Sequence, residues 1–535
     1  MALSPRLLKG SAFTPRSISG LALWLDASDS STLFQNSDGT VPATATSDPV
    51  GYWADKSGNG RHAVQATAGN RGAISATNQG GRKALAFNAT TKNIVSPATV
   101  AQYVADATTS PKVFFAFVAR PEGGSSLIAY GSPTNPNSNS RIFYCTDFGS
   151  PGSHIVDFGA ISGARLTGAV GDEADNVGHV YSAFRDGAIM SVRRDGVEIL
   201  RKTDCSGVYS DTTGTLAINA AQGASGTASW CEFLTYAASM SASNITRIER
   251  YLAARWGITL APQVANADAQ DWVNRVYQNG GTVSSATAGA VNTFCESIAS
   301  AGIRDRFYRM NLFCGSFQGA FVPLFRGPSL GGTQYGGTTD TNLGSPAFLV
   351  GDYNETGVSG GLLGNGTTKY LNTAFNVDQL PGAANCHLSS FITGTQDIAS
   401  PRALIGTLFN GVADRYRIFL NNTTAGNYLL FTELGVSSQA SATRANANGG
   451  LMLASRTGPT LLTLYDDAVS VGTNETSTAE VTGASPFFVF ARNGPTEFYN
   501  GRMAAYSIGA GMTAAQVTAY NTAMQAFQTA MTRIA

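Results

Sequence analysis

FNATTKNI, at residues 87–94, recurs in the same chain as GNGTTKYL, at residues 364–371. A second pair of similar segments lies further along, where WCEFLTYAASMSASN, from Trp230, matches NGRMAAYSIGAGMTAAQ, from Asn500. Each member of the second pair leads into a stretch with helical spacing of apolar residues. Two similar segments that recur in the same order and at similar separation indicate a duplicated domain, because the period is too long for a solenoid repeat.

The composition favours a β protein rich in turns. Charged residues make up 13% of the 535 positions, about half of the usual ~25%, and glycine occurs 60 times. A chain of this length accommodates two β-sandwiches of ~200–250 residues each. Lys and Arg together number 35, as do Asp and Glu, so no net charge draws the chain to nucleic acid or to an anionic membrane.

Short strand-like segments separated by turn signals begin at Ile18 and resume at Asn311. Clear examples in the first half are KVFFAFVAR (112–120) and IMSVRRDGVEIL (189–200). In the latter, Asp195-Gly196 separates two alternating runs, which is a strong hairpin signal. Many short strands at this spacing predict sandwiches or barrels.

Each half of the chain ends in a segment whose apolar residues have helical spacing. Ser243 is the expected cap of a helix whose apolar face includes Ile245 and Trp256, with Gly257 as its stop. The second closing helix is expected from Thr513 to about Met531. Its exposed side carries almost no charge, so we expect it to lie against another subunit.

Two further helices, at 268–280 and 285–303, predict a helical hairpin that is a connector between the halves or an insertion at the front of the second domain. The expected domains are a polar N-terminal arm at 1–17, a first sandwich at 18–260, a helical connector at 261–310 and a second sandwich at 311–535. The arm needs a partner or the domain surface to be ordered.

The N-terminus has basic residues but no apolar core of 7–15 residues, so it does not fit a signal peptide. No apolar run approaches the ~18 residues of a membrane helix. The six cysteines show no CxxC spacing and only four histidines are present, which argues against a zinc site. We expect buried free thiols; whether Cys205 and Cys231 pair stays open.

Three stretches of the first half resemble the concanavalin A-like lectin or laminin G-like jelly-roll family: LALWLDASDSSTLFQ (21–35), DPVGYWADKSGNGRHAVQATAGNRG (48–72) and GRKALAFNATTKNI (81–94). They look most like the branch found in bacterial surface proteins and tailed-phage structural proteins. The likeness covers most of residues 18–260, whereas the second half has no counterpart of DKSGNG. The resemblance implies an all-β chain of two jelly-roll β-sandwiches, each closed by a C-terminal helix, with a short helical hairpin between them.

Lectins of this fold bind sugars through loops or a concave face that carry aromatic and polar groups. Aromatic residues beside turns are also common at the edge of a hydrophobic core. With that alternative open, the resemblance suggests four ligand-binding candidates: Tyr52, Trp53, Asn59 and Tyr335.

A calcium site is the weaker expectation, with Asp26, Asp29 or Asp55 as ligands, because hard cations require several oxygen ligands. The favoured interpretation of these acids is structural, since Asp caps turns by accepting from backbone N–H groups. Asp352 and Glu355 cluster in GDYNETG but lack the further acids of a calcium loop. No other cofactor is expected.

No enzyme signature stands out, and the sequence predicts a protein that is not an enzyme. A jelly-roll glycosidase needs two carboxylates flanking the scissile bond. The acidic segment that comes nearest to such a pattern, GDEADNVG with Glu173 and Asp175, is predicted to be a loop. The histidines, His62, His154, His179 and His387, have no nucleophile motif such as G-x-S-x-G beside them.

The leading functional hypothesis is a structural component of a tailed-phage virion, as a decoration, fibre or tail-associated protein. We expect it at the virion surface after synthesis in the host cytoplasm, with other virion proteins and further copies of itself as partners and host-surface polysaccharide as a further ligand. Alternatives are a carbohydrate-binding adhesin and, third, a glycan hydrolase.

Overall fold

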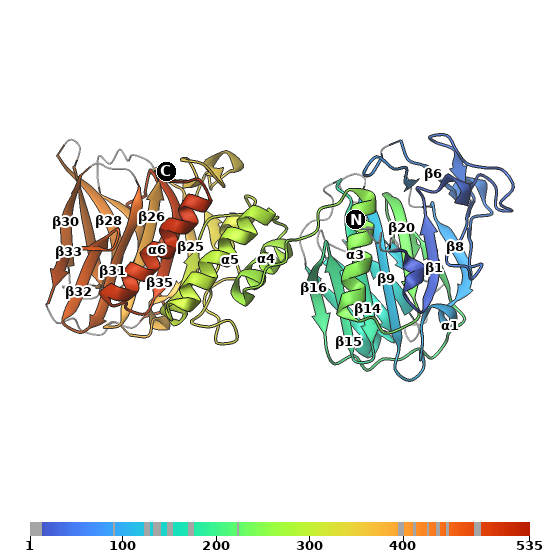
Figure 1. Cartoon of the computed structure of the whole chain (residues 1–535), viewed down its shortest axis with the longest axis horizontal. Helices are drawn as coiled ribbons and strands as arrows, with labels where there is room; N and C mark the ends of the chain where they lie inside the picture. Colours follow the sequence, from blue (N-terminus) through green and yellow to red (C-terminus); the bar gives the residue numbers. More distant parts are fainter. Residues whose placement is uncertain are drawn as a thin grey trace, which may run out of the picture. The chain divides into compact units, whose positions relative to one another are not determined.

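The computed structural model describes most of the chain from Phe13 to Ile534. Within this span the following residues are not described: 77, 89–90, 122–128, 132–140, 147–152, 170–175, 222–223, 383, 394–400, 410–413, 425–426, 435–438, 446–448 and 476–482. Thr90 of the repeat, Glu173, Asp175 and most of the expected arm therefore lie outside the described residues. The chain divides into two compact units, Met1–Ala261 and Pro262–Ala535 (Figure 1).

The first unit consists of two packed antiparallel sheets, as expected for a jelly roll. The order of the first sheet is β16 (Val197–Lys202), β15 (Ile189–Arg194), β14 (His179–Asp186), β9 (Lys112–Pro121), β20 (Ala228–Tyr236), β7 (Leu85–Phe87), β6 (Gly72–Ile74) and β3 (Pro49–Val50), with β1 (Leu21–Asp26) paired to β20.

The order of the second sheet is β13 (Arg165–Ala169), β12 (Ser153–Gly159), β11 (Arg141–Cys145), β10 (Ala129–Gly131), β17 (Thr215–Ile218), β8 (Ile94–Thr99), β5 (Ala63–Val64), β4 (Tyr52–Trp53) and β2 (Leu33–Phe34). A small ribbon pairs β18 (Ala220–Ala221) with β19 (Ala224–Ser225), and the short helices α1 (Val100–Tyr103) and α2 (Ile161–Ala164) lie in connections.

The central strands of the first sheet, β9 and β20, are buried on both faces. The inner face of this sheet packs on the second sheet, where the ring of Phe117 lies 5.6 Å from that of Tyr144 on β11 and the ring of Phe115 lies 5.6 Å from that of Phe158 on β12. Its outer face is covered by the helix α3 (Ala242–Trp256), as Figure 1 shows. Two buried faces explain why β9 reads as a continuous apolar run and not as an alternating one.

The N-cap of α3 is Ser241, not Ser243 as the sequence suggested. The Oγ of Ser241 accepts from the N–H of Asn244, so the helix begins two residues earlier than expected. Gly257 ends the helix in the left-handed conformation, with φ of 65°, as predicted.

The second unit repeats this plan. One sheet has the order β23 (Tyr353–Asn354), β24 (Gly361–Leu363), β35 (Arg502–Gly509), β26 (Cys386–Thr393), β31 (Gly450–Gly458), β32 (Leu461–Asp466) and β33 (Val469–Asn474), with β21 (Phe307–Asn311) paired to β35. The other has the order β22 (Thr341–Leu343), β25 (Tyr370–Asn376), β34 (Pro486–Val489), β27 (Arg402–Phe409), β28 (Asp414–Thr424), β29 (Asn427–Leu434) and β30 (Gln439–Ala445).

The repeated sequence segments occupy matching places. FNATTKNI runs from β7 into β8, and GNGTTKYL connects β24 to β25. In each unit these two strands belong to different sheets, next to β20 or its counterpart β35 in one and next to β17 or its counterpart β34 in the other. The all-β class with two jelly-roll sandwiches is thus confirmed, and so is a C-terminal helix.

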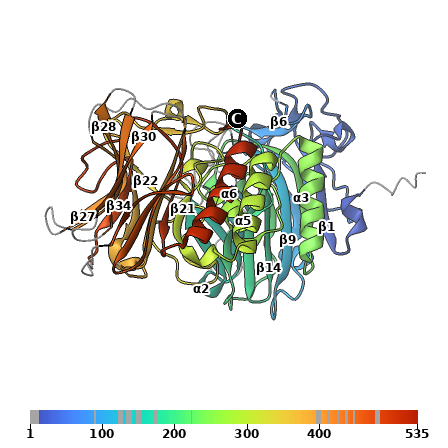
Figure 2. The ribbon, with the colours of Figure 1, turned by 60° about the vertical axis from the view of Figure 1, so that its left-hand side comes forward.

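The helices α4 (Ala267–Gln278) and α5 (Ser285–Ser300) fall within the second unit. The helix α5 lies beside the closing helix α6 (Ala514–Ala530), where the rings of Phe294 and Phe527 are 5.8 Å apart (Figure 2). Their small residues leave a cavity of about 260 Å³ between the two helices.

All six cysteines are buried, and Cys205 and Cys231 do not form a disulfide with each other. Within the described residues, none of the helices combines the length and the apolar character that crossing a bilayer requires.

Candidate functional site

Two acidic residues meet beneath α3. Asp26 on β1 is the direct cross-strand partner of Glu232 on β20, and both side chains point to the face that α3 covers. Both residues are 0% exposed. Carboxylates are rarely buried completely unless they are paired, so their partners define the chemistry of the site.

Glu232 is held by hydrogen-bond donors from the sheet and the helix. Its Oε1 accepts from Trp24 Nε1 at 2.7 Å and from Tyr251 Oη at 2.8 Å, and its Oε2 accepts from Trp256 Nε1 at 2.8 Å. Burial and the nearby charge of Asp26 raise the pKa of Glu232 to about 7, although the three donors favour the ionised form. Its carboxyl group therefore titrates near neutral pH.

Asp26 is neutralised by two cations. Its Oδ2 lies 2.8 Å from Lys56 Nζ and 2.6 Å from Arg255 Nη2. Arg255 also contacts Glu232, with 3.2 Å between Nε and Oε2, so one guanidinium group bridges both acids. Lys56 in turn lies 2.8 Å from Asp29 Oδ2.

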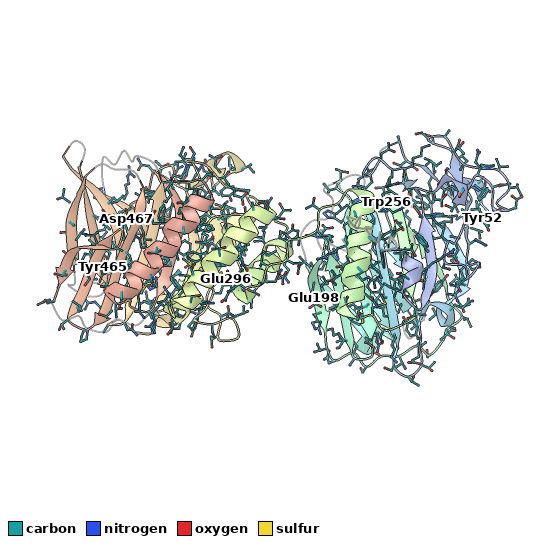
Figure 3. The ribbon with its side chains drawn as sticks, in the orientation of Figure 1. Tyr52, Glu198, Trp256, Glu296, Tyr465 and Asp467 are labelled. Carbon is teal, nitrogen blue, oxygen red and sulfur yellow. The ribbon has the colours of Figure 1, made fainter. Side chains whose placement is uncertain are left out.

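An open groove lies above these carboxylates on the solvent side of α3. It has a volume of about 500 Å³ and is lined by aromatic and basic residues: Phe13, Arg82, Arg247, Arg250, Tyr251, Ala254 and Arg255. Figure 3 shows Trp256 at one end of this helix and Tyr52 well away from it in the same sandwich.

Contacts around Phe13 organise one part of the groove. Phe13 meets the Tyr251 ring edge to face, with 5.6 Å between centroids, and the guanidinium group of Arg247 lies 4.9 Å from the Phe13 ring centroid. Arg82 comes from the turn after β6, and its Nε donates to the carbonyl oxygen of Arg255 at 2.7 Å. Aromatic faces and fixed guanidinium donors therefore line one hollow.

The calcium candidates occupy other roles. Asp26 and Asp29 share Lys56, whose ammonium group lies between them, and Asp29 also caps Ser31. Asp55 accepts from the backbone N–H groups of Trp24, Ser57 and Arg61. Among the described residues, no group of three or more His, Cys, Asp and Glu side chains has a metal-binding arrangement. The calcium expectation stays a prediction.

The four ligand-binding candidates do not form one site. Trp53 is fully buried, so its ring packs in the core and cannot line a binding surface. Tyr52 is half-buried and stacks on His62 at 5.1 Å. Asn59 donates to the carbonyl oxygens of Leu21 and Ala22. Tyr335 belongs to the second unit, stacked on Tyr308.

A buried Ser–His contact lies in the second unit, and no sequence motif indicates it. His387 Nε2 lies 2.8 Å from Ser507 Oγ, and burial lowers the pKa of His387 to about 4. Both residues are fully buried beneath α6, and Ser507 is also bonded to Ser389. The other ring nitrogen of His387 lies 2.7 Å from the carbonyl oxygen of Ala510, and Tyr520 of α6 bonds to Ser389. This buried polar cluster is sealed from solvent and offers no access to a substrate.

No protein-family model and no curated protein sequence matches the chain. Solved structures do match at low identity. Domain 4 of AbnA, a GH43 extracellular arabinanase from Geobacillus stearothermophilus in complex with arabinotriose, is 14% identical over 43% of this chain and 98% of its own, with a TM-score of 0.31.

Domains LG4–5 of the mouse laminin α1 chain are 10% identical over 76% of this chain and 84% of theirs, with a TM-score of 0.25. An arabinofuranosidase complexed with arabinofuranosyl-α-1,2-xylobiose is 13% identical over 92% and 97%, with a TM-score of 0.32.

One sequence-based prediction needs correction. The expectation that the chain is not an enzyme is wrong on these comparisons, because an arabinanase and an arabinofuranosidase are among the matched structures.

Proposed function

We propose that the protein binds saccharides through the groove on α3 and does so as a surface component of a tailed-phage particle. The single observation that carries saccharide binding is the groove itself, an open hollow of about 500 Å³ lined by two aromatic side chains and four arginines. Ligand sites commonly combine apolar lining with a few fixed polar groups.

The lining is fixed before any ligand arrives. The Tyr251 hydroxyl group is bonded to Glu232, and Arg255 is held by Asp26. The buried carboxylates thus hold the floor of the groove in one conformation. A site held in place in this way loses less conformational entropy when it binds a ligand.

The placement on a phage particle rests on the sequence. The stretches at 21–35, 48–72 and 81–94 resemble those of tailed-phage structural proteins, and the low charge and Gly-rich composition are compatible with a particle component. Electron cryomicroscopy of particles made with and without this gene product tests the role. Particles with identical density would contradict it.

Binding is tested with an array of host-surface polysaccharides, followed by calorimetry on the ligands that bind. The informative variant is Phe13→Ala, because the half-buried ring of Phe13 lines the groove. We expect about a tenfold loss of affinity. The matched control is Tyr335→Ala, which removes an aromatic side chain in the second unit. If only the control variant lost binding, the site would lie elsewhere.

A glycan hydrolase working in the same groove is the second candidate. One observation favours it: Tyr251, which lines the groove, donates to Glu232, whose pKa near 7 suits proton transfer at neutral pH. The assay measures reducing ends released from each polysaccharide that binds. The variant Tyr251→Phe keeps the ring and removes the hydroxyl group. Absence of release by the wild-type protein on a bound polysaccharide would reject this candidate.

A further inference from the structure

We infer that the groove selects saccharides that carry carboxylate groups, and that Arg247 and Arg250 bind the carboxylate. This inference rests on the proposed saccharide binding and names its ligand class. It follows from the charge balance of the groove, from the geometry of its arginines and from a comparison with the second unit.

The charge balance leaves an excess of cations at the groove. Arg255 and Lys56 are paired with the buried acids. Within the part of the chain that the structure describes, Arg82, Arg247 and Arg250 have no carboxylate partner; Arg82 bonds to a carbonyl oxygen and Arg247 to the side chain of Asn244. Three guanidinium groups without counter-charge, in a chain with only 13% charged residues, attract an anion to this place.

The arrangement suits a planar anion on a sugar. Arg247 and Arg250 are three residues apart on one exposed helix face, so their side chains are neighbours. Arg82 reaches the same groove from a different segment and is oriented by its bond to the carbonyl oxygen of Arg255. Guanidinium groups bind carboxylates through two parallel N–H donors, and a sugar ring packs on the adjacent aromatic surface of Phe13.

The second unit shows that the fold does not require these arginines. The helix α6 covers its sheet in the same way, with Val517, Tyr520 and Met524 buried, and carries no charged residue. When both helices are counted from their N-caps, Ser241 and Thr513, the counterparts of Arg247, Arg250 and Arg255 are Ala519, Thr522 and Phe527. The basic groove is therefore particular to the first unit and needs a reason other than helix packing.

The test is calorimetric titration of the full chain with trigalacturonate, with its fully methyl-esterified form and with a sulfated oligosaccharide of equal length. The methyl ester keeps the sugar and removes only the charge. We expect trigalacturonate to bind at least tenfold more tightly than its ester and more tightly than the sulfated probe. Affinity should fall as salt increases.

Substitutions assign the effect to the groove. Arg247→Gln and Arg250→Gln should each weaken trigalacturonate binding about tenfold while leaving ester binding unchanged. Arg201→Gln, at an exposed arginine of β16 paired with Glu198, is the control and should have no effect. Circular dichroism checks that each variant is folded.

The outcomes separate this inference from the proposed function. Equal binding of acid and ester, with loss in Phe13→Ala, would overturn charge selection and leave saccharide binding intact. Tighter binding of the sulfated probe would overturn the choice of carboxylate. Failure of every saccharide to bind, or binding that Phe13→Ala does not weaken, would overturn the proposed function as well.

Discussion

Asp26 and Glu232 stand directly opposite each other on β1 and β20, fully buried beneath α3. Like charges at paired positions repel, and burial adds a desolvation cost. The two acids respond differently, because Asp26 has two cations beside it whereas Glu232 depends mainly on neutral donors. The pair is thus a source of pH dependence located under the proposed binding groove.

The variant Glu232→Gln should change how the free energy of unfolding of the first unit depends on pH. The folded-state pKa of Glu232, about 7, lies above the ordinary value of 4.5. The folded protein therefore holds a proton that the unfolded chain releases between these two values, and the wild type gains stability as the pH falls from 7 to 4.5. This gain, about 3 kcal/mol, is absent in the variant.

Urea unfolding at a series of pH values between 4 and 8 measures the difference between wild type and Glu232→Gln. The difference should grow on acidification through this window. The control is Glu296→Gln, at an exposed residue of α5 in the second unit, which should follow the wild-type profile. A constant difference across the window would show that Glu232 does not titrate there.

The second unit has a buried ion pair of its own. Arg309 and Asp340 are 2% exposed or less, with 2.6 Å between Arg309 Nη2 and Asp340 Oδ1, and Tyr506 Oη donates to the same carboxylate at 2.8 Å. The variant Arg309→Met leaves Asp340 buried without its cation. We expect a loss of roughly 3–5 kcal/mol in the stability of this unit.

The double variant Arg309→Met, Asp340→Asn removes both charges and should recover part of the loss. Thermal unfolding followed by tryptophan fluorescence and circular dichroism measures both variants. If the double variant were as unstable as the single one, the loss would come from altered packing and not from an unpaired charge.

The packing of α3 on the first sheet is the third test. Leu252 is fully buried between helix and sheet, and Leu252→Ala should cost about 2–5 kcal/mol. Hydrogen exchange should rise first in α3 and β14. Thr246→Ala, at a half-buried position of the same helix, should change exchange little. Unchanged protection in Leu252→Ala would show that α3 is held chiefly by the polar contacts of Glu232.

The sequence predicts the architecture well because its evidence is local. Strands and turns, such as the hairpin at Asp195-Gly196, are predicted from neighbouring residues in the sequence. The duplication is visible as two similar sequence segments. The cap of α3 is misplaced by two residues because Ser241 and Ser243 are both good caps and only backbone geometry distinguishes them. Phe13 and Arg16, at the end of the expected arm, contact Tyr251 and the carbonyl oxygen of Lys56.

The site could not be read from sequence because its members are distant along the chain. Glu232 accepts from Trp24, 208 residues away, and from Tyr251, 19 residues away on α3, and only the fold brings these side chains together. Its pKa depends on Asp26, whose position opposite Glu232 follows from strand register. Asp26 is a candidate from the sequence because it is an acid near a strand end. Its ion-pair partners, Lys56 and Arg255, are marked by no local sequence pattern.

The repeated segment GNGTTKYL allows a last prediction. In the second unit, Asn365 Oδ1 accepts from the backbone N–H groups of Thr367, Thr368 and Lys369, which fixes the turn between β24 and β25. The variant Asn365→Ala leaves these donors to water and should destabilise the second unit by about 1 kcal/mol. Thermal unfolding and hydrogen exchange of residues 361–371 measure the effect.

Thr367→Ala is the matched control, because its side chain is exposed and only its backbone takes part in the turn. It should leave stability within about 0.5 kcal/mol of wild type. A loss in this variant as large as that in Asn365→Ala would mean that the threonine side chains, and not the asparagine cap, hold the turn. The conserved element of the two copies would then be the Thr-Thr-Lys sequence itself, and a role for it beyond strand entry would have to be sought.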